Sequence, residues 1–209
     1  MENSKKIFLT SCGIIDEELK KHFIKALNKK IEDAKLLFIK IASEGELDPD
    51  TTWIEEEYES ILELGIEADN ITTFSYDNDI DFEDYDIIYM LGGNTFYLMK
   101  KLRECNLISK INNAIDKGVV YIGSSAGSVI MGKSIETSLP YDENWVNLED
   151  FSGLNYVDAN VVPHANRKQE FINKIKEAGS NNIIELYDNY GFVIEENKEY
   201  NYNKPYTNQ

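Results

Sequence analysis

The sequence predicts an α/β domain with a largely parallel sheet, and two observations lead to this expectation. Short apolar runs alternate along the chain with helical patterns of ten or more residues, as in consecutive βαβ units. The runs are apolar throughout, which indicates strands covered on both faces. The chain has 209 residues without repeats, Pro-rich linkers or low-complexity tracts. We therefore expect a single domain over residues 1–209, because this length suits one sizeable core.

The amino-terminal part of the chain supplies the first strands and helices. Lys6–Ser11 and Leu36–Ser43 are apolar runs of buried-strand type. Between them, apolar residues recur at helical spacing over Glu17–Ile31. Thr52-Trp-Ile-Glu55 has the pattern of a capping box, so a helix is expected to begin there and to end at Gly65.

The rest of the chain continues the alternation. Helices are expected from Asn94 onward and over Leu107–Lys117, with Gly118 as the stop of the second. The sequence also predicts four further strands, over Ile71–Ser75, Tyr85–Gly93, Val119–Gly123 and Val157–Pro163. The carboxyl-terminal residues from Asn201 are polar and tyrosine-rich, and we expect them to be peripheral.

Composition and charge narrow the class of protein. Apolar residues make up 42% of the chain and aromatic residues 11%, which favours a folded domain over a disordered one. A formal charge of −17 repels phosphate backbones and anionic lipid, so neither nucleic acid nor a membrane is expected as a partner. No apolar run reaches the length of about 18 residues that suggests a membrane span.

The two cysteines and the amino-terminal residues bear on the cellular compartment in which the protein is expected. Cys12 and Cys105 lie far apart, without the spacing of a metal knuckle or of a disulfide framework. We expect Cys12 to be a small buried residue and the protein to lie in a reducing cytoplasm. No metal or cofactor is expected. The first residues also lack the long apolar core and the cleavage site of a signal peptide.

The stretch Gly-Ser-Ser-Ala-Gly, residues 123–127, carries the main functional signal. It lies where an apolar strand turns into a helical pattern, which is the context of a nucleophile elbow. Ser125 is then either a nucleophile held out on a strained turn or part of an ordinary tight connection. Small flanking residues suit the first alternative, and the helix that begins there would direct backbone N–H groups at an oxyanion. Ser124 and Ser128 lie off the central position and are expected to be structural.

A serine nucleophile needs a general base and an acid that orients the base. His22 falls among lysines on a helical pattern and is expected to be solvated, whereas His164 ends an apolar run and is the better candidate base. Spacing does not choose the acid. The candidates before His164 are Asp142, Glu143, Glu149, Asp150 and Asp158, and those after it are Glu185 and Asp188.

Four stretches together resemble the peptidase E family, serine peptidases related to cyanophycinase with a fold like that of class I glutamine amidotransferases. The stretches are "YMLGGNTFYLMKKLRE", "VVYIGSSAGSVIMGKSIET", "VVPHANRKQEFI" and "IIELYDNYGFVIEE". The match covers most of the chain from about Tyr85 to Glu196, in this order. Glutamine amidotransferases have cysteine at the elbow, so serine indicates the peptidase branch. The resemblance implies a single three-layer, flavodoxin-like α/β domain.

The resemblance also implies a set of roles. Ser125 would be the nucleophile, His164 the base and Asp188 the acid, while the N–H groups of Gly93 and Ala126 would form the oxyanion hole. The reaction would be hydrolysis through an acyl-enzyme, without metal or cofactor. An α/β-hydrolase esterase is an alternative, in which the acid would precede the histidine. A binding or regulatory domain that retains the elbow without chemistry is another.

The family also suggests a substrate. Its best-known members release N-terminal aspartate from dipeptides, so the partner expected here is a short peptide, and Asn94 and Arg167 would contact it. Arg167 could instead be an exposed residue paired with Glu170. The family's Asn-Asp-Met-Pro stretch is replaced by "TSLPYD", which leaves selectivity for aspartate open. The sequence does not determine the oligomeric state, and a homodimer is one possibility.

Overall fold

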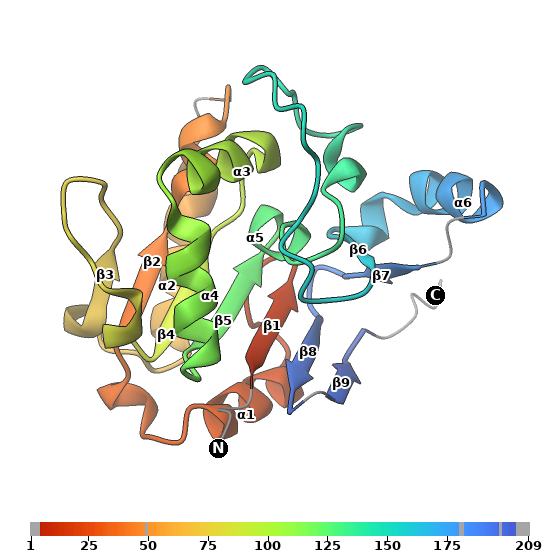
Figure 1. The fold of residues 1–209 in the computed structure, drawn as a ribbon. Coiled ribbons are helices and arrows are strands. Elements are labelled where there is room, and N and C mark those ends of the chain that lie inside the picture. Colours follow the sequence, from red (N-terminus) through yellow and green to blue (C-terminus); the bar gives the residue numbers. More distant parts are fainter. Residues whose placement is uncertain (1–4, 49, 180–181, 197, 204–209) are drawn as a thin grey trace.

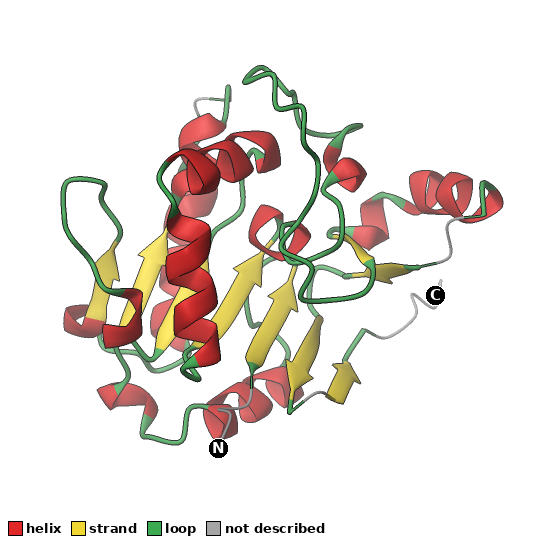
Figure 2. Ribbon diagram, in the orientation of Figure 1, coloured by secondary structure: helices red, strands yellow, loops and turns green. Residues whose placement is uncertain are grey.

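The computed structural model describes residues 5–48, 50–179, 182–196 and 198–203. Its centre is a seven-stranded sheet (Figures 1 and 2). In spatial order the strands are β3 (Ile71–Thr73), β2 (Leu36–Ile39), β4 (Ile87–Met90), β5 (Val120–Ser124), β1 (Lys6–Thr10), β8 (Gly191–Glu195) and β9 (Lys198–Asn201). The first five strands are mutually parallel, while β8 is antiparallel to β1 and to β9. The expected α/β class with a largely parallel sheet is confirmed.

Helices cover both faces of this sheet, which gives three layers (Figure 1). One face is covered by α3 (Thr95–Glu104), α4 (Leu107–Asp116) and the short α5 (Ala126–Val129), and the other by α1 (Glu17–Ala26) and α2 (Thr52–Glu63). Short 3₁₀ turns connect the elements: Ile31–Asp33, Ile41–Gly45, Ala68–Asn70, Phe82–Asp84, Glu136–Ser138 and Ala165–Arg167. None of the helices in the described ranges has the length and apolar character needed to cross a bilayer.

The strands are apolar at every position because their side chains alternate between two cores. Ile7 and Leu9 of β1 belong to the core under α3 and α4, whereas Phe8 between them packs with α1 and α2. In β4, Ile88 and Tyr89 divide between the same two cores. This two-sided burial is the physical reason for the continuous apolar runs.

A second, two-stranded sheet lies beside the upper end of β1 in Figure 1. It consists of β6 (Asn160–Val162) and β7 (Ile183–Glu185), which are parallel and joined through α6 (Gln169–Glu177). The strand expected over Val157–Pro163 therefore exists but is shorter. The residues that follow β6 and β7 are brought toward the carboxyl ends of β1 and β5.

Two local expectations about helices were wrong. The first helix ends at Ala26 because Asn28 adopts a left-handed backbone, with φ 56°, that stops the helix before Ile31. The capping box at Thr52 does not form, and the carboxylate of Asp50 accepts the Thr52 N–H instead, at 3.0 Å.

The expectation that His22 is solvated was also wrong. Its side chain is only 10% exposed. Nδ1 lies 2.8 Å from the Tyr202 hydroxyl, and Nε2 lies 2.9 Å from a carboxylate oxygen of Glu195. The described end of the chain therefore closes over α1, which the polar composition of that segment does not reveal.

Candidate active site

The elbow at Ser125 is an abrupt turn from a strand into a helix, with a single residue between them. β5 ends at Ser124, α5 begins at Ala126, and Ser125 between them has φ 46° and ψ −110°. Such a backbone is strained for a residue with a Cβ. A side chain at Gly123 would place its Cβ 2.6 Å from the carbonyl oxygen of Gly127. The flanking glycine is therefore required by the close approach of the two backbones, and Ser125 is held outward.

The neighbouring serines brace this turn, as expected for structural residues. The Ser128 hydroxyl lies 2.7 Å from the Thr10 carbonyl and 2.8 Å from the Gly123 carbonyl, and it accepts the Thr10 N–H. The Ser124 hydroxyl donates to the Ser11 carbonyl at 3.2 Å. Both side chains are buried, so Ser125 is the serine of the three that faces the open cavity.

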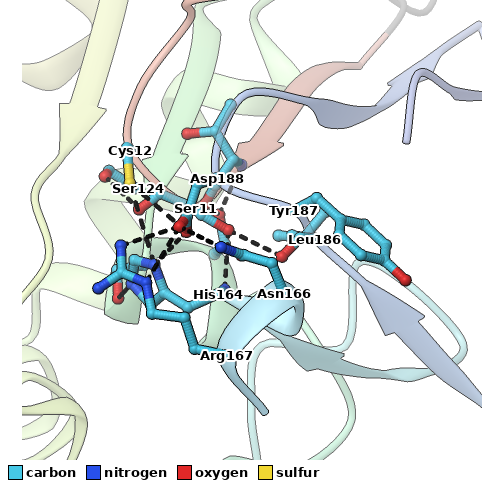
Figure 3. A network of polar contacts seen from close by, with 12 residues as sticks. Ser11, Cys12, Ser124, His164, Asn166, Arg167, Leu186, Tyr187 and Asp188 are labelled. Carbon is cyan, nitrogen blue, oxygen red and sulfur yellow. Dashed lines mark hydrogen bonds and ion pairs between the residues drawn. The ribbon is translucent and has the colours of Figure 1, made fainter. Parts of the chain in front are cut away.

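The three residues singled out through the resemblance lie in one hydrogen-bonded chain. The Ser125 hydroxyl is 3.1 Å from His164 Nε2, and His164 Nδ1 is 2.7 Å from Asp188 Oδ1. The other oxygen, Oδ2, accepts hydrogen bonds from Asn166 Nδ2 at 2.7 Å and from Arg167 Nη2 at 2.8 Å (Figure 3). Asp188 therefore holds the imidazole in the tautomer whose Nε2 can accept the serine proton.

Ser11 joins the small sheet to the central one. Its hydroxyl donates to the Leu186 carbonyl at 3.0 Å and accepts the His164 N–H at 2.9 Å (Figure 3). It follows β1 directly and is buried. A single hydroxyl thus fixes the segment that carries His164 and the segment that leads into Asp188.

Burial and charge tune the pKa values of this chain. Burial lowers the pKa of His164, and the cations of Lys168 and Arg167 act in the same direction, against the opposing effect of Asp188. Burial alone would raise the pKa of Asp188, but hydrogen bonds from Asn166, His164 and Arg167 bring it below its usual value. At neutral pH the pair is a neutral imidazole beside a carboxylate, which suits a general base.

The other acids that spacing left open do not reach His164. Asp142 Oδ2 accepts the Thr95 N–H at 2.8 Å, and burial raises the pKa of this carboxyl. Asp158 is exposed and pairs with Lys133. Within the described ranges, the hydrogen-bond and ion-pair partners of the imidazole likewise do not include the remaining candidates, Glu143, Glu149, Asp150 and Glu185.

The two backbone N–H groups that the resemblance assigns to an oxyanion hole belong to residues beside the cavity and the elbow: Gly93 lines the cavity, and Ala126 directly follows Ser125. Gly93 and Ala126 have no hydrogen-bond acceptor for their N–H groups within the described ranges. Gly93 has φ 127°, and a Cβ there would lie 2.6 Å from the Ser43 nitrogen, so this loop requires glycine. Both N–H groups are therefore free to donate to a ligand, as an oxyanion hole requires.

The two residues expected to contact substrate have other partners. Asn94 is buried, with its Oδ1 accepting the Tyr97 N–H at 2.9 Å and its Nδ2 donating to the Glu143 carbonyl. It is the N-cap of α3. Arg167 pairs with Asp188 and not with Glu170. Its guanidinium therefore supports the Asp188 carboxylate, at the edge of the cavity that Arg167 also lines.

A cavity of about 730 Å³ opens beside Ser125 and His164. Its lining carries many acidic side chains, namely Glu46, Asp48, Asp50, Glu56, Glu57 and Asp142. Lys168 also lines it, 4.0 Å from the centre of the Tyr141 ring, and burial lowers the pKa of this lysine to about 8. Unlike Arg167, Lys168 forms no ion pair within the described part of the chain.

Sequence reasoning missed several residues of this site. Ser11 and Cys12 directly follow β1, so the rule that ligands bind at the carboxyl ends of parallel strands could have found them. Cys12 is partly exposed, and its Sγ lies 3.9 Å from His164 Nδ1. Burial and the nearby Asp188 raise the thiol pKa to about 12, so the thiol is protonated. Asn166 and Lys168 flank Arg167, and only the fold shows where they point.

Comparison with known sequences adds independent support for the family. The profile of "Peptidase family S51" matches residues 7–200. The chain belongs to this family. An uncharacterized peptidase of Listeria monocytogenes serovar 1/2a, Lmo0363, is 35% identical to this S51 chain over 115 residues, which cover 52% of the chain and 56% of that relative. Peptidase E of Escherichia coli O1:K1 is 35% identical over 82 residues, 39% of the chain and 35% of the relative. The aligned part thus spans about a third to a half of these relatives.

Solved structures match nearly all of this S51 chain. A candidate peptidase E protein from Listeria monocytogenes EGD-e superposes with a TM-score of 0.78 and 25% identity, covering 94% of the chain and 97% of the neighbour. A peptidase from an acI-B1 actinobacterium gives a TM-score of 0.62 at 18% identity, over 93% and 84%, and shows likeness of fold alone. The resemblance noted from sequence motifs is confirmed at the level of family and fold.

Proposed function

We propose that this protein is a serine peptidase that hydrolyses short peptides through an acyl-enzyme on Ser125. The observation that supports it most directly is the chain from the Ser125 hydroxyl to His164 Nε2, at 3.1 Å, and from Nδ1 to Asp188, at 2.7 Å. Membership of family S51 supports the same chemistry. The strained elbow adds to this support, since strain of this kind concentrates at functional sites.

The mechanism follows from the positions of the groups. His164 Nε2 removes the hydroxyl proton as the Ser125 oxygen attacks the peptide carbonyl. The N–H groups of Gly93 and Ala126 stabilise the oxyanion, and each such donor is worth about 3 kcal/mol of barrier. His164 then donates the proton to the leaving amine. Water repeats the cycle, giving its proton to His164 and releasing the acid product.

The charges around the cavity favour a peptide with a free amino terminus. An α-ammonium group is the cation that every unblocked short peptide carries, and the acidic lining attracts it. A peptide carboxylate needs a cation, and Lys168 is available for that role because Arg167 is bound to Asp188. We therefore propose Lys168 as the partner of a substrate carboxylate, including the side chain of an N-terminal aspartate in a dipeptide.

Hydrolysis of a substrate panel tests this function. Dipeptides and aminoacyl-p-nitroanilides with Asp, Glu, Asn, Ala and Leu are offered to the wild type, to Ser125→Ala and to Ser109→Ala, an exposed serine on α4. We expect turnover by the wild type and by Ser109→Ala, and none by Ser125→Ala at an unchanged melting temperature. Equal turnover by Ser125→Ala would overturn the proposal.

The alternative functions predict different outcomes. In an α/β-hydrolase esterase the acid precedes the histidine, whereas the carboxylate against His164 here follows it in the chain. An esterase would cleave p-nitrophenyl esters and leave peptides intact. A domain that retains the elbow without chemistry would hydrolyse neither class of substrate and would not react with a fluorophosphonate.

A further inference from the structure

Cys12 lies against the side of the imidazole that faces away from Ser125. Its Sγ is 3.9 Å from His164 Nδ1 and 3.8 Å from Asp188 Oδ1, while Nδ1 and Oδ1 are 2.7 Å apart. Figure 3 shows Cys12 on the loop after β1, beside this pair. Within the described ranges these three residues form the one cluster of histidine, cysteine and carboxylate side chains close enough together to share a metal ion.

Each side of the triangle of sulfur, nitrogen and oxygen is within about 1 Å of the ligand separations in a tetrahedral zinc site. Zn²⁺ binds imidazole nitrogen and carboxylate oxygen at about 2.0–2.1 Å and thiolate sulfur at about 2.3 Å. Tetrahedral geometry then separates the ligand atoms by about 3.3–3.5 Å. The sulfur of Cys12 is already near this separation from both partners, at 3.9 and 3.8 Å. On this estimate the contact between His164 and Asp188 must open by about 0.6–0.8 Å, and the sulfur must approach both atoms by about 0.3–0.6 Å.

The surroundings favour entry and capture of a cation. Oδ2 of Asp188 is held by Asn166 and Arg167, which fixes the carboxylate with Oδ1 toward the sulfur. Outer partners that orient a ligand in this way strengthen metal sites. Cys12 and His164 both line the open cavity, whose acidic lining concentrates divalent cations beside them. The positive charge of Arg167 opposes the binding of a cation, but the guanidinium contacts Oδ2 of Asp188 and not Oδ1.

We propose that Cys12, His164 and Asp188 form an inhibitory Zn²⁺ site, in which the ion binds Sγ, Nδ1 and Oδ1 and a water molecule completes the tetrahedron. On binding, the thiol proton is released to solvent, and the Nδ1 proton is replaced by the metal while Nε2 becomes protonated. His164 can then no longer accept the Ser125 proton. The inhibition rests on the proposed peptidase function, whereas the binding does not.

The ligand set selects among metals. A thiolate with an imidazole suits Zn²⁺, while Mg²⁺ and Ca²⁺ prefer all-oxygen sites. Millimolar Mg²⁺ will therefore occupy the exposed carboxylate clusters of this acidic chain and leave the proposed site to Zn²⁺. Co²⁺ is a useful probe because its absorption shows a thiolate charge-transfer band only when sulfur binds the metal.

Calorimetric titration with Zn²⁺ in excess Mg²⁺ tests the binding directly. The proteins are the wild type, Cys12→Ala, Cys12→Ser and Cys105→Ala, which removes the exposed cysteine far from the site. We expect one ion per chain in the wild type and in Cys105→Ala, with affinity weakened about tenfold or more in both Cys12 variants. Ser125→Ala should bind as the wild type does, because its hydroxyl is not a ligand. Wild-type affinity in a folded Cys12→Ala protein would overturn the site.

Inhibition is measured separately, as the ratio of turnover with and without Zn²⁺ for each protein. We expect Zn²⁺ to inhibit the wild type and Cys105→Ala, with reversal by a chelator, and to require about tenfold more ion in Cys12→Ala. If no variant turns over peptides, the peptidase proposal fails and the calorimetry still decides the site. If Zn²⁺ binds at Cys12 and turnover continues, the inhibitory role is overturned.

Discussion

Arg167 donates two hydrogen bonds to Oδ2 of Asp188, from Nε at 3.1 Å and from Nη2 at 2.8 Å, although its own side chain is 67% exposed. A guanidinium in this position orients the acid and keeps it ionised. It also lowers the pKa of His164 in the same direction as burial does. Arg167, for which the sequence leaves open a substrate contact or a pair with Glu170, therefore contacts the acid proposed to orient His164.

This relationship predicts the behaviour of Arg167→Ala. We expect kcat to fall about tenfold, equivalent to about 1.4 kcal/mol of barrier, by a similar factor for Asp-X and Ala-X dipeptides. The pKa of His164 should rise without the neighbouring cation. Since the base must be neutral, the acidic limb of kcat/KM then moves to higher pH. A rise in KM confined to Asp-X peptides would instead identify Arg167 as a substrate contact. Arg167→Lys should recover part of the rate.

Asp188→Asn should reduce kcat by about 10⁴-fold, because an amide no longer favours the tautomer with a free Nε2. KM should change little, since the carboxylate does not reach the cavity side of the imidazole. Steady-state kinetics over a range of pH measure both quantities. Asp158→Asn, which alters an exposed acid paired with Lys133, is the matched control and should behave as the wild type. An undiminished rate in Asp188→Asn would exclude it as the orienting acid.

Ser125→Gly and Ser125→Ala separate catalysis from backbone strain. Both remove the nucleophile, but only glycine relaxes the conformation at φ 46°. The strain costs about 1–3 kcal/mol, and the greater entropy of unfolded glycine offsets about 0.5–1 kcal/mol of the gain. We expect Ser125→Gly to be more stable than Ser125→Ala by about 1 kcal/mol in urea unfolding. Equal or lower stability of the glycine variant would show that the turn is not strained.

Ser11→Ala should weaken both the fold and the reaction. The substitution leaves the His164 N–H without its acceptor and removes one donor to the Leu186 carbonyl. An unsatisfied buried polar group costs about 1–3 kcal/mol. We expect the free energy of unfolding to fall by about 2 kcal/mol and kcat to fall while KM is retained. Ser109→Ala on the exposed face of α4 is the control. A loss of stability without any change in kcat would restrict Ser11 to a structural role.

If Lys168 binds a substrate carboxylate, its deprotonation should lower kcat/KM at alkaline pH only for substrates that carry this carboxylate. Its pKa is lowered by burial to about 8, so its charge is present below that pH and is lost as the pH rises through it. For Asp-X dipeptides kcat/KM should therefore fall above about pH 8, through KM. Aminoacyl-p-nitroanilides with uncharged side chains carry the same α-ammonium, which titrates at about pH 8, but no carboxylate, so they should lack only the part of this limb that Lys168 contributes. In Lys168→Arg this part of the limb should move beyond the accessible range, and its persistence there would assign it to another group.

Sequence patterns predicted the sheet well because strands buried on both faces are apolar throughout, as β4 and β5 are. They singled out Ser125 and His164 because each lies just beyond an apolar strand, β5 and β6. They did not choose among the acids, since the contact between His164 and Asp188 depends on how the small sheet docks. That docking is fixed by Ser11, whose role no local pattern records.

Side-chain partners were the least predictable feature. Arg167 and Glu170 are three residues apart, a spacing that favours a helical ion pair, yet Asp188 competes successfully for the guanidinium. His22 is enclosed by residues from β8 and from the chain end, which are remote in sequence. Cys12 meets His164 for the same reason. Each of these contacts is set by tertiary structure and not by the local sequence.

The central claim is that His164 activates the Ser125 hydroxyl for attack, and covalent labelling tests it most directly. The wild type, Ser125→Ala and Asp188→Asn are treated with a fluorophosphonate, and the modified peptide is identified by mass spectrometry. We predict rapid labelling of the wild type at Ser125, strongly slowed labelling of Asp188→Asn, and none of Ser125→Ala. Absence of wild-type labelling, or an adduct on Ser124 or Ser128 instead, would contradict the assignment.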